Sequence, residues 1–437
     1  MFKLAAHQLR AIEEIRQRDV ALWYKPRTGK TMCPLAYIAE GIRDGSVNNA
    51  LVICPASAIT AWEQNIEKVP LFDGYDALDR DMLQEIVTIT SYGKFKTMQM
   101  DKGTHRPPHR KVRPRDQFLK PWDIVIVDES HALGDRTSQQ TRAILQIAEY
   151  AARRVILTGT PDGKRYEKLY GQLKFLDPDL WPKVADFDAE IIKERDFFKK
   201  PIKYHEDRAL ELRDHYGIYA RLEECYDMPP ILADDIRYVD LAEKAAYNDM
   251  LKGNFTKWNI DPQGGGTSGI KRLQIVSGHI KTDAGTVQLR TAKETALADY
   301  ILGTDEPLVI FCQFRASIDL CARIAEDCGR SPVTYDGRAD LYDWQKFQSG
   351  QHDVIVAQYQ RGSQCIDLNR ADTTIFFEPT GSSINHEQAR SRTRAVKTSK
   401  IPTSNVYLVT RGTLEQKLFD RMIAGLDTPD SMLDRME

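Results

Sequence analysis

The 437-residue chain is poor in cysteine and has no long apolar run, and each of these absences excludes a class of protein. Its seven cysteines include no C-x-x-C pair, and several lie inside apolar runs, so we expect reduced core residues and no structural metal. No apolar run approaches the roughly 20 residues that a membrane-spanning helix needs. The N-terminus enters an amphipathic helical pattern directly, without the basic and apolar leader of a secreted protein. We therefore expect a cytoplasmic protein that does not cross a membrane.

The chain also lacks an overall charge of one sign, because 61 Lys and Arg face 63 Asp and Glu and leave a net charge of −2. A nucleic-acid partner must therefore be argued from local patches. The strongest local bias runs from Asp101 to Lys120, where seven cations, two carboxylates and three prolines occur without a helix or strand period. Two interpretations stay open for this stretch, a contact with phosphates and a disordered, solvated insertion.

What the chain does have is an alternation of short apolar runs, rich in Val and Ile, with helical stretches. This alternation is typical of parallel sheets that are covered by helices on both faces. The predicted strands are Val20–Tyr24, Ala50–Cys54, Val87–Thr90, Ile124–Val127 and Val155–Leu157 in the first half, and Leu308–Cys312, Val354–Ala357, Thr373–Phe377 and Val406–Val409 in the second. The pattern predicts the α/β class, and the length suits two domains plus connections.

The alternation divides the chain into three predicted parts. Residues 1–185 and 291–437 each form an α/β lobe with a parallel sheet. Residues 186–290 form a mainly helical, charge-rich connector that joins the two lobes. The connector contains the glycine-rich stretch Gln263–Gly269, which is the most obvious flexible joint in the chain.

The segment Tyr24–Thr31, called the phosphate loop below, follows the first predicted strand and opens a predicted helix. A loop at this place directs backbone N–H groups and a helix N-terminus toward phosphate oxygens. Lys30 would contact the β- and γ-phosphates of a nucleotide, and Thr31 would bind Mg²⁺. Tyr24 replaces the first glycine of the usual loop, and Gly-Lys-Thr alone also fits an ordinary strand-to-helix turn.

The stretch Trp122–His131 is an apolar strand that ends in paired carboxylates. Phosphoryl transfer needs an anchored Mg²⁺ and a water oriented in line with the leaving phosphate. Asp128 suits the metal, directly or through a water, and Glu129 suits the general base. A solvated acidic turn would not explain a phosphate loop about a hundred residues upstream, in the order that such a fold requires.

With these two motifs the chain resembles the Swi/Snf branch of superfamily-two helicases and, in its compactness, the small phage members of that branch. The resemblance runs from Leu4 to about Ile423, which is nearly the whole chain. The further segments that carry it, in family order, are Leu4–Gln8, Leu51–Ser57 followed by Trp62, Thr88–Tyr92, Leu157–Pro161, Ile310–Phe314, Tyr335–Gly337, Gly362–Leu368 and Gln388–Arg394. It implies two RecA-like lobes that close on one ATP.

The resemblance also implies cofactors and roles for individual residues. ATP and Mg²⁺ would be bound by Gln8 at the adenine, by Arg27, Thr28, Gly29, Lys30 and Thr31 in the phosphate loop, and by Asp128, with Thr31 and Asp128 at the metal. Nucleic acid would be contacted by Pro55, Ala56, Ser57, Thr90, Ser91, Tyr92, Gln313, Gly362 and Ser363. Catalysis would use Lys30, Glu129 and an arginine finger from Arg392 or Arg394.

Besides Tyr24, three positions depart from the family pattern. Arg27 occupies the usual place of a glycine in the phosphate loop, where it would contact a phosphate or point to solvent. In the last motif Arg392 has Ala395 three residues on, where a second arginine is usual, so the finger is assigned first to Arg392 and then to Arg394. Cys365 replaces a usual glycine and would stiffen its loop.

The resemblance favours a monomeric ATP-dependent translocase or helicase acting on DNA, with duplex favoured over single strand and little sequence specificity. An RNA helicase is one alternative, although the acidic motif reads Asp-Glu-Ser-His and not the Asp-Glu-Ala-Asp usual in that branch. A clamp that binds nucleic acid without hydrolysing ATP is another, and the intact Lys30, Asp128 and Glu129 argue against it. A viral origin would place the protein in the cytoplasm of the host.

Overall fold

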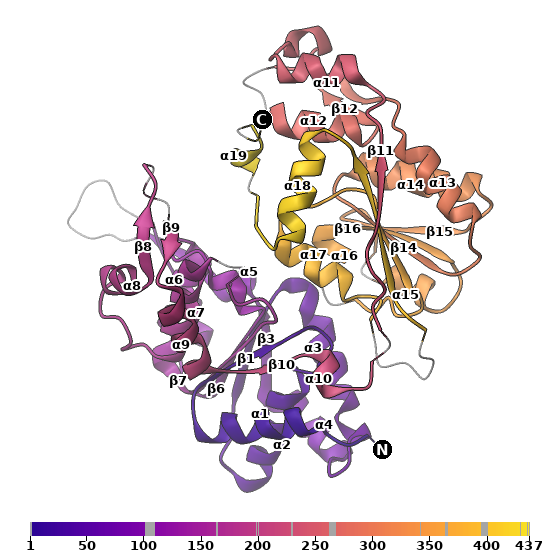
Figure 1. Ribbon diagram of the computed structural model, residues 1–437. Helices are drawn as coiled ribbons and strands as arrows, with labels where there is room; N and C mark the ends of the chain where they lie inside the picture. The colour runs from indigo at the N-terminus through magenta and orange to yellow at the C-terminus, as the bar shows by residue number, and fades with distance from the viewer. Residues whose placement is uncertain are drawn as a thin grey trace. The chain divides into compact units, whose positions relative to one another are not determined.

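The chain divides into two compact units, Met1–Asp227 (unit 1) and Met228–Glu437 (unit 2), each built around one parallel sheet (Figure 1). The computed structural model describes residues 2–100, 110–162, 165–197, 199, 201–228, 230–261, 268–340, 342–362, 366–394, 401–428, 430–434 and 436. Both sheets have six strands, and every strand pair in them is parallel. The predicted fold, two RecA-like α/β lobes, is confirmed.

The sheet of unit 1 has the strand order β10-β1-β7-β6-β2-β3. Its strands are β1 (Val20–Tyr24), β2 (Ala50–Cys54), β3 (Val87–Ser91), β6 (Trp122–Asp128), β7 (Ala151–Leu157) and β10 (Gly217–Ala220). The helices around it are α1 (Ala6–Gln17), α2 (Met32–Asp44), α3 (Ile59–Lys68), α4 (Ala77–Ile86), α5 (Tyr92–Phe95), α6 (Gln139–Ile147), α7 (Leu169–Leu176), α8 (Val184–Ile191), α9 (Glu206–Tyr216) and α10 (Leu222–Cys225).

The apolar runs of unit 1 form central strands because they are buried on both faces. All residues of β1 and β2 are buried. One face of the sheet packs against apolar residues of α6, α7, α8 and α9, and Figure 1 shows α1, α2 and α4 on the other side. A strand with one exposed face alternates apolar and polar residues. These strands are covered by helices on both faces, so their sequences are continuous runs of Val and Ile.

Unit 2 repeats this architecture with the strand order β11-β18-β17-β14-β16-β15. The strands are β11 (Asp235–Val239), β14 (Leu308–Cys312), β15 (Pro332–Tyr335), β16 (Val354–Gln358), β17 (Thr373–Phe376) and β18 (Ser404–Thr410). The helices are α11 (Lys244–Leu251), α12 (Ser268–Val276), α13 (Lys293–Leu302), α14 (Arg315–Asp327), α15 (Trp344–Gln348), α16 (Tyr359–Gly362), α17 (Ser383–Arg390), α18 (Leu414–Ile423) and α19 (Asp430–Leu433), and a hairpin joins β12 (His279–Thr282) to β13 (Gly285–Gln288).

The division of the chain differs from the predicted lobe, connector and lobe. The residues expected to form a separate connector are divided between the two units at position 227. Strand β10 extends the first sheet beside β1, and β11 extends the second beside β18. Both are edge strands, and β11 has no buried residue. Because an edge strand needs no apolar run, the sequence pattern gave no sign of either. Of the predicted flexible joint Gln263–Gly269, residues 263–267 lie outside the described residues, and Ser268 and Gly269 begin α12.

Unit 1 also contains two antiparallel strand pairs outside its main sheet. They pair β4 (Lys96–Met100) with β5 (Arg110–Pro114), and β8 (Ile192–Arg195) with β9 (Pro201–Tyr204). The expectation of no regular structure from Asp101 to Lys120 is therefore wrong for the part that β5 occupies. Pairing with β4 satisfies the β5 backbone, and the Gln146 amide donates to the Val112 carbonyl at 3.1 Å. Residues 101–109 lie outside the described part of the chain.

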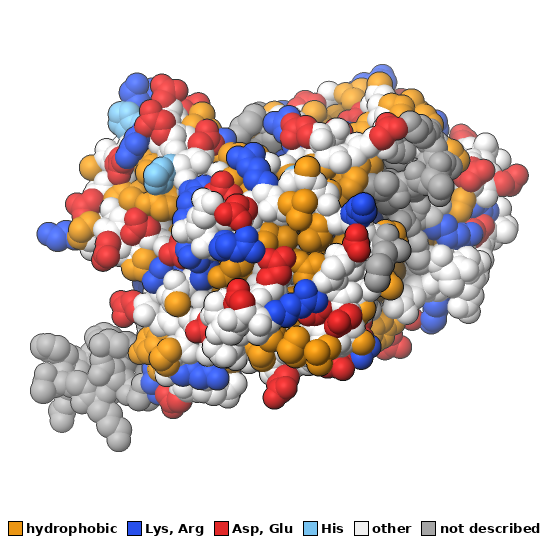
Figure 2. Space-filling view, turned by 90° about the horizontal axis from the view of Figure 1, so that it is seen from below, with side chains coloured by type: hydrophobic (Ala, Val, Ile, Leu, Met, Phe, Trp, Pro, Cys, Tyr) orange, Lys and Arg blue, Asp and Glu red, His pale blue; other side chains and the backbone are white. Residues whose placement is uncertain are grey.

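The described cysteines agree with the expectation of reduced thiols, because all six are free and four are buried. Within the described ranges no three or more His, Cys, Asp or Glu side chains are grouped as a metal site would require. None of the helices in these ranges is both long enough and apolar enough to span a bilayer. Figure 2 shows Lys, Arg, Asp and Glu side chains interspersed over one face, in line with the small net charge.

Candidate nucleotide-binding site

The phosphate loop joins the end of β1 to the start of α2, as predicted. Thr28 is buried, and its hydroxyl donates to the Lys25 carbonyl at 2.8 Å, which closes the loop on itself. Thr31 is the residue before the first turn of α2, so the loop leads directly into a helix N-terminus. Unpaired backbone N–H groups at such a place bind phosphate oxygens.

Arg27 shows why a glycine is usual at its position. Its φ is +67°, in the left-handed region, and Gly29 two residues on has a φ of +76°. A side chain in this region costs about 1–2 kcal/mol, because Cβ approaches the following carbonyl oxygen. The loop therefore keeps the left-handed turn that glycine normally supplies and takes the strain on the Arg27 backbone.

Two side chains of α1 hold the loop from its other side. The Gln8 side-chain amide donates to the Gly29 carbonyl at 3.2 Å, and its carbonyl accepts from the Ala5 backbone N–H at 2.9 Å. His7 Nε2 lies 2.7 Å from the Thr28 carbonyl, and a carbonyl only accepts, so Nε2 carries the proton. A Cβ at Gly29 would lie 2.4 Å from the Gln8 amide nitrogen, so another residue there would displace this side chain in addition to straining the backbone at its φ of +76°.

The acidic motif, Asp128–His131, begins at the end of β6, next to the phosphate loop. Lys30 Nζ lies 3.1 Å from Glu129 Oε1, although 99 positions separate the two residues. Asp128 is 5% exposed and accepts two hydrogen bonds, from the Trp62 indole N–H at 2.9 Å and from the Glu129 backbone N–H at 2.9 Å. The fold thus brings together the two motifs that the sequence proposed as halves of one site.

The two carboxylates have pKa values displaced in opposite directions. Burial raises the pKa of Asp128, although the charge of Lys30 opposes this effect. Burial would also raise the pKa of Glu129, but Lys30 and His131 together hold it well below its usual value. His131 Nδ1 lies 3.2 Å from Glu129 Oε2. Glu129 is therefore kept ionised, as a general base must be.

The segment Leu157–Pro161, called the coupling segment below, packs directly on this site. A Cβ at Gly159 would lie 2.9 Å from Pro26 Cδ and 3.1 Å from the Tyr24 carbonyl, so only glycine allows the approach. Thr158 Oγ1 lies 3.1 Å from His131 Nδ1. His131 therefore lies between Glu129 and the coupling segment.

The predicted nucleic-acid residues of unit 1 fall into two groups. Pro55 and Ser57 are half-buried and Ala56 is exposed, at the end of β2. Thr90, Ser91 and Tyr92 are buried in this unit. The Ser91 hydroxyl accepts from the Lys94 N–H at 3.2 Å, and the Tyr92 hydroxyl donates to the Asp128 carbonyl at 2.6 Å. Tyr92 thus supports the acidic motif from within.

The basic stretch offers fewer available cations than its sequence suggests. Arg113 forms an ion pair with Asp116 at 2.7 Å. The Lys120 ammonium lies 4.3 Å from the centre of the Trp122 ring, a cation–π distance. Both cations already have partners within unit 1.

In unit 2, Gln313 follows β14 and is fixed through its backbone. Its N–H donates to Glu378 Oε2 at 2.6 Å, and the Phe314 N–H lies 3.3 Å from the same oxygen. Glu378 follows β17 and is buried, and its carboxylate accepts from the backbone N–H groups that precede α14. Gly362 ends α16, and Ser363 lies outside the described residues.

The candidate finger arginines follow α17, which ends at Arg390. The Arg390 guanidinium donates to Asp234 at 2.9 Å, so it is paired inside unit 2. The Arg392 guanidinium donates to the Ile366 carbonyl at 3.3 Å, and Arg394 is half-buried. Ala395 lies outside the described residues.

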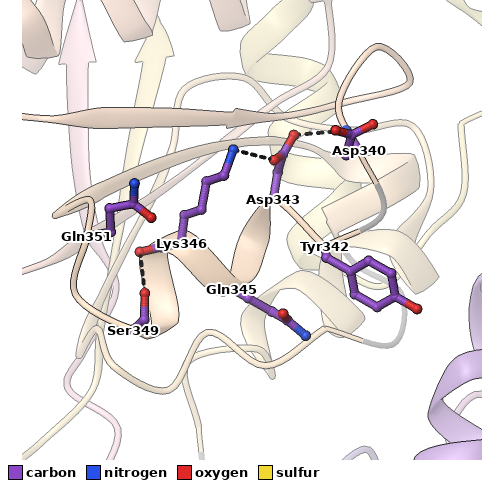
Figure 3. A pocket seen from close by; sticks show the side chains of 7 residues that line it. All are labelled: Asp340, Tyr342, Asp343, Gln345, Lys346, Ser349 and Gln351. Atoms are coloured by element: carbon purple, nitrogen blue, oxygen red, sulfur yellow. Dashed lines mark hydrogen bonds and ion pairs between the residues drawn. The ribbon is translucent and has the colours of Figure 1, made fainter.

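A separate hollow of about 760 Å³ lies around α15 in unit 2 (Figure 3). Its charged groups satisfy one another, because Lys346 Nζ lies 2.8 Å from Asp343 Oδ1 and the Asp340 N–H donates to Asp343 at 2.8 Å. None of the predicted site residues lines it. It is therefore unrelated to the nucleotide site.

Four supporting residues escaped the sequence reasoning. His7 and Glu378 carried no signal, since each acts on a backbone group that only folding brings near. Trp62 stood in a segment that carries the resemblance but received no role; it is buried, and its indole N–H donates to Asp128. His131 stood in the acidic motif but received no role.

Comparison with known proteins places this site in a family context. The family model of the SNF2-related domain matches residues 25–225, which is most of unit 1. The chain is 28% identical over 163 residues to the Arabidopsis thaliana protein Chromatin Remodeling 19, covering 35% of this chain and 21% of that protein. It is 23% identical over 500 aligned positions to human chromodomain-helicase-DNA-binding protein 7, covering 99% of this chain and 16% of that protein.

Two further similarities extend along most of the chain. The bovine DNA annealing helicase and endonuclease ZRANB3 is 22% identical over 389 residues, covering 84% of this chain and 34% of that protein. A solved SWI2/SNF2 ATPase core from Sulfolobus solfataricus, in complex with double-stranded DNA, is 19% identical, with a TM-score of 0.43 and coverage of 99% of this chain and 92% of that one. The chain spans about a third or less of the length of the three curated relatives. The chain is therefore similar to SNF2-related proteins, two of which are named as helicases.

Proposed function

We propose that the chain is a translocase that couples ATP hydrolysis to movement along duplex DNA. The observation that carries this proposal is the 3.1 Å contact between Lys30 Nζ and Glu129 Oε1, since it joins a phosphate loop to an ionised general base. DNA is the favoured track because relatives of this chain are named as a DNA annealing helicase and as a DNA-binding helicase. The contacts that we propose with DNA concern its backbone and carry little sequence information.

The residues present fit a magnesium nucleotide. Asp128 is a buried carboxylate whose oxygens each accept one hydrogen bond and retain further lone pairs. Carboxylate and hydroxyl oxygens, here of Asp128 and Thr31, are the ligands that Mg²⁺ prefers. When bound, Mg²⁺ would neutralise charge on the β- and γ-phosphates.

The protein groups then divide the remaining work. When a nucleotide binds, the Lys30 ammonium would contact the phosphates and weaken its contact with Glu129. The Glu129 carboxylate would then be available to the attacking water. Glu129 would accept the proton of that water, and His131 would hold the carboxylate in place through Oε2. His131 also contacts Thr158, so a change in the position of Glu129 would alter the contact of His131 with the coupling segment.

Movement requires that the second unit respond to the nucleotide. We propose that Arg392, or else Arg394, acts as the finger that stabilises charge on the γ-phosphate. Pro55–Ser57 and Gln313 would then bind the DNA backbone tightly in turn, one contact strengthening as the other weakens. Loss of the γ-phosphate would remove the interaction that favours the closed state.

One comparison of rates tests the proposal. The ATPase rate of the whole chain should be low alone and rise most with duplex DNA, less with single-stranded DNA and least with RNA. A larger stimulation by RNA would identify an RNA helicase instead. An absence of hydrolysis under all four conditions, with binding retained, would identify a clamp.

A further inference from the structure

The side chain of Gln172 is fully buried in unit 1, on a helix that packs against the acidic motif. Helix α7 lies on the same face of the sheet as α6 and α9 (Figure 1), and all of its residues except Lys174 are buried. A Cβ at the neighbouring Gly171 would lie 2.4 Å from the Leu133 carbonyl, so the helix approaches the turn Ser130–Leu133 closely. An amide in such packing is costly to bury unless its polar atoms are bonded.

Three hydrogen bonds satisfy this amide and fix its orientation. Gln172 Nε2 donates to the Pro161 carbonyl at 2.6 Å and to the Lys168 carbonyl at 3.1 Å. Carbonyl oxygens only accept, so Nε2 must face them and Oε1 must face the opposite side. There Oε1 accepts from the Ser130 hydroxyl, which is also fully buried, at 2.8 Å. One amide, called the amide bridge below, thus joins the acidic motif to the end of the coupling segment.

The Ser130 end of the amide bridge lies next to the proposed base. Glu129 has a φ of +51°, in the left-handed region that residues other than glycine rarely adopt. Such a conformation persists only where the surrounding structure constrains it. On one side the Glu129 N–H donates to Asp128 at 2.9 Å, and on the other side Gln172 holds Ser130. The amide bridge is therefore one of the constraints on the direction of the Glu129 side chain.

The Pro161 end of the amide bridge lies in the coupling segment. That segment packs against the phosphate loop at Gly159, and it contacts the acidic motif a second time through Thr158 and His131. The two connections act on different groups. His131 contacts the carboxylate of the base, whereas Gln172 holds the residue that follows the base in the chain. A displacement of the Pro161 carbonyl would therefore move the backbone at the acidic motif through Gln172.

We propose that Gln172 is a positioning residue that makes the placement of Glu129 depend on the coupling segment, so that bound DNA raises ATP turnover through this amide. The inference rests on the proposed function, because it concerns how DNA stimulates the ATPase. Gln172 acts through Ser130, and it belongs to none of the segments to which the ATP and DNA contacts were assigned. Its effect should consequently appear in the rate of the chemical step and not in the binding of either ligand.

Steady-state ATPase kinetics of the whole chain, with and without saturating duplex DNA, test this role. Gln172→Met keeps an unbranched side chain of similar length and removes all three hydrogen bonds, and Ser130→Ala removes only the bond at the acidic motif. Each variant should lower kcat with duplex DNA by about tenfold to a hundredfold, since a small misplacement of a catalytic group has effects of this size. The KM for ATP and the Kd for duplex DNA should keep their parental values.

A double variant separates positioning from folding. Ser130→Ala combined with Gln172→Met removes the hydroxyl and the amide together, so its melting temperature should fall by less than the sum of the two single falls. Its kcat with duplex DNA should nevertheless stay as low as that of Gln172→Met, because both changes break the same bridge. Thr141→Val is the matched control. It removes another buried hydroxyl of unit 1, which donates to the Asp135 carbonyl at 2.8 Å, and it should keep the parental stimulation by DNA.

The possible outcomes distinguish this inference from the proposed function. Parental stimulation by DNA in the double variant would overturn the role of Gln172, and so would an equal loss of stimulation in Thr141→Val. A raised KM for ATP with an unchanged kcat would overturn it as well, because Gln172 would then affect binding. If no nucleic acid stimulates the parent ATPase, the proposed function fails, and the inference fails with it.

Discussion

The indole N–H of Trp62 donates to Oδ2 of Asp128 at 2.9 Å, so a buried tryptophan orients the carboxylate proposed to bind Mg²⁺. The same carboxylate accepts from the backbone N–H of Glu129, the proposed base. One buried aromatic residue therefore influences both halves of the acidic motif.

Replacing the proposed base should abolish turnover without abolishing binding. Glu129→Gln removes the proton acceptor, and loss of a positioned base lowers rates by about 10²–10⁴. ATP affinity should survive, because the change removes a charge and keeps the pocket. Single-turnover hydrolysis and nucleotide binding of the same preparation measure the two effects. A parental rate in Glu129→Gln would show that another group is the base.

Removing the Trp62 hydrogen bond should move the acidic limb of the pH profile. Burial raises the pKa of Asp128, and the Trp62 N–H opposes this rise because it stabilises the ionised form. In Trp62→Phe this pKa should rise further, and since Asp128 must be ionised to bind Mg²⁺, kcat/KM should fall at a higher pH as the solution is acidified. Trp122→Phe is the matched control, because that buried indole donates to the Phe118 carbonyl away from the site. Coincident acidic limbs in the parent and Trp62→Phe would contradict the assigned contact.

The finger assignment predicts a difference between neighbouring arginines. Arg392→Ala should lower turnover sharply and leave ATP affinity nearly unchanged, because a finger acts mainly on transition-state charge. Arg390→Ala should affect turnover much less, since Arg390 is paired with Asp234 in its own unit. Steady-state kinetics of both variants decide the point. The reverse order would show that the last motif is aligned by the wrong residue.

The strain at Arg27 predicts an unusual preference for glycine. Arg27→Gly and Arg27→Ala both remove the guanidinium, and only alanine retains a Cβ in the left-handed region. The glycine variant should therefore be more stable than the alanine variant by about 1 kcal/mol. Denaturant unfolding followed in unit 1 compares the two. Equal stability would mean that the loop relaxes out of the left-handed conformation.

The buried ion pair of unit 2 predicts a large loss of stability. Lys293 Nζ lies 2.5 Å from Glu415 Oε1, and both side chains are fully buried. Lys293→Met leaves an unpaired buried carboxylate and should lower the free energy of unfolding by about 3–5 kcal/mol. Adding Glu415→Gln should recover much of this loss, because a neutral amide oxygen can still accept from the Thr410 N–H. A loss below about 1 kcal/mol in the single variant would contradict the expected cost of leaving the Glu415 carboxylate without Lys293.

The central strands were predictable because burial on both faces leaves one clear pattern. The runs Val20–Tyr24, Ala50–Cys54 and Leu308–Cys312 have the bounds of β1, β2 and β14. The edge strands β10 and β11 were not predictable in this way. Strand β11 is held by its hydrogen bonds to β18, and its side chains stay accessible, so its sequence carries no apolar run.

The sequence by itself determined the class of fold and the two motifs that meet at the site, because the spacing of loop, strand and carboxylates is local and is required in that order. Only the tertiary structure decided what supports them. His7 at the Thr28 carbonyl, Trp62 at Asp128 and Gln172 at Ser130 each join segments that are distant in the chain. Such a contact depends on how whole helices and strands pack together, so it cannot be predicted from the residue pattern of one segment.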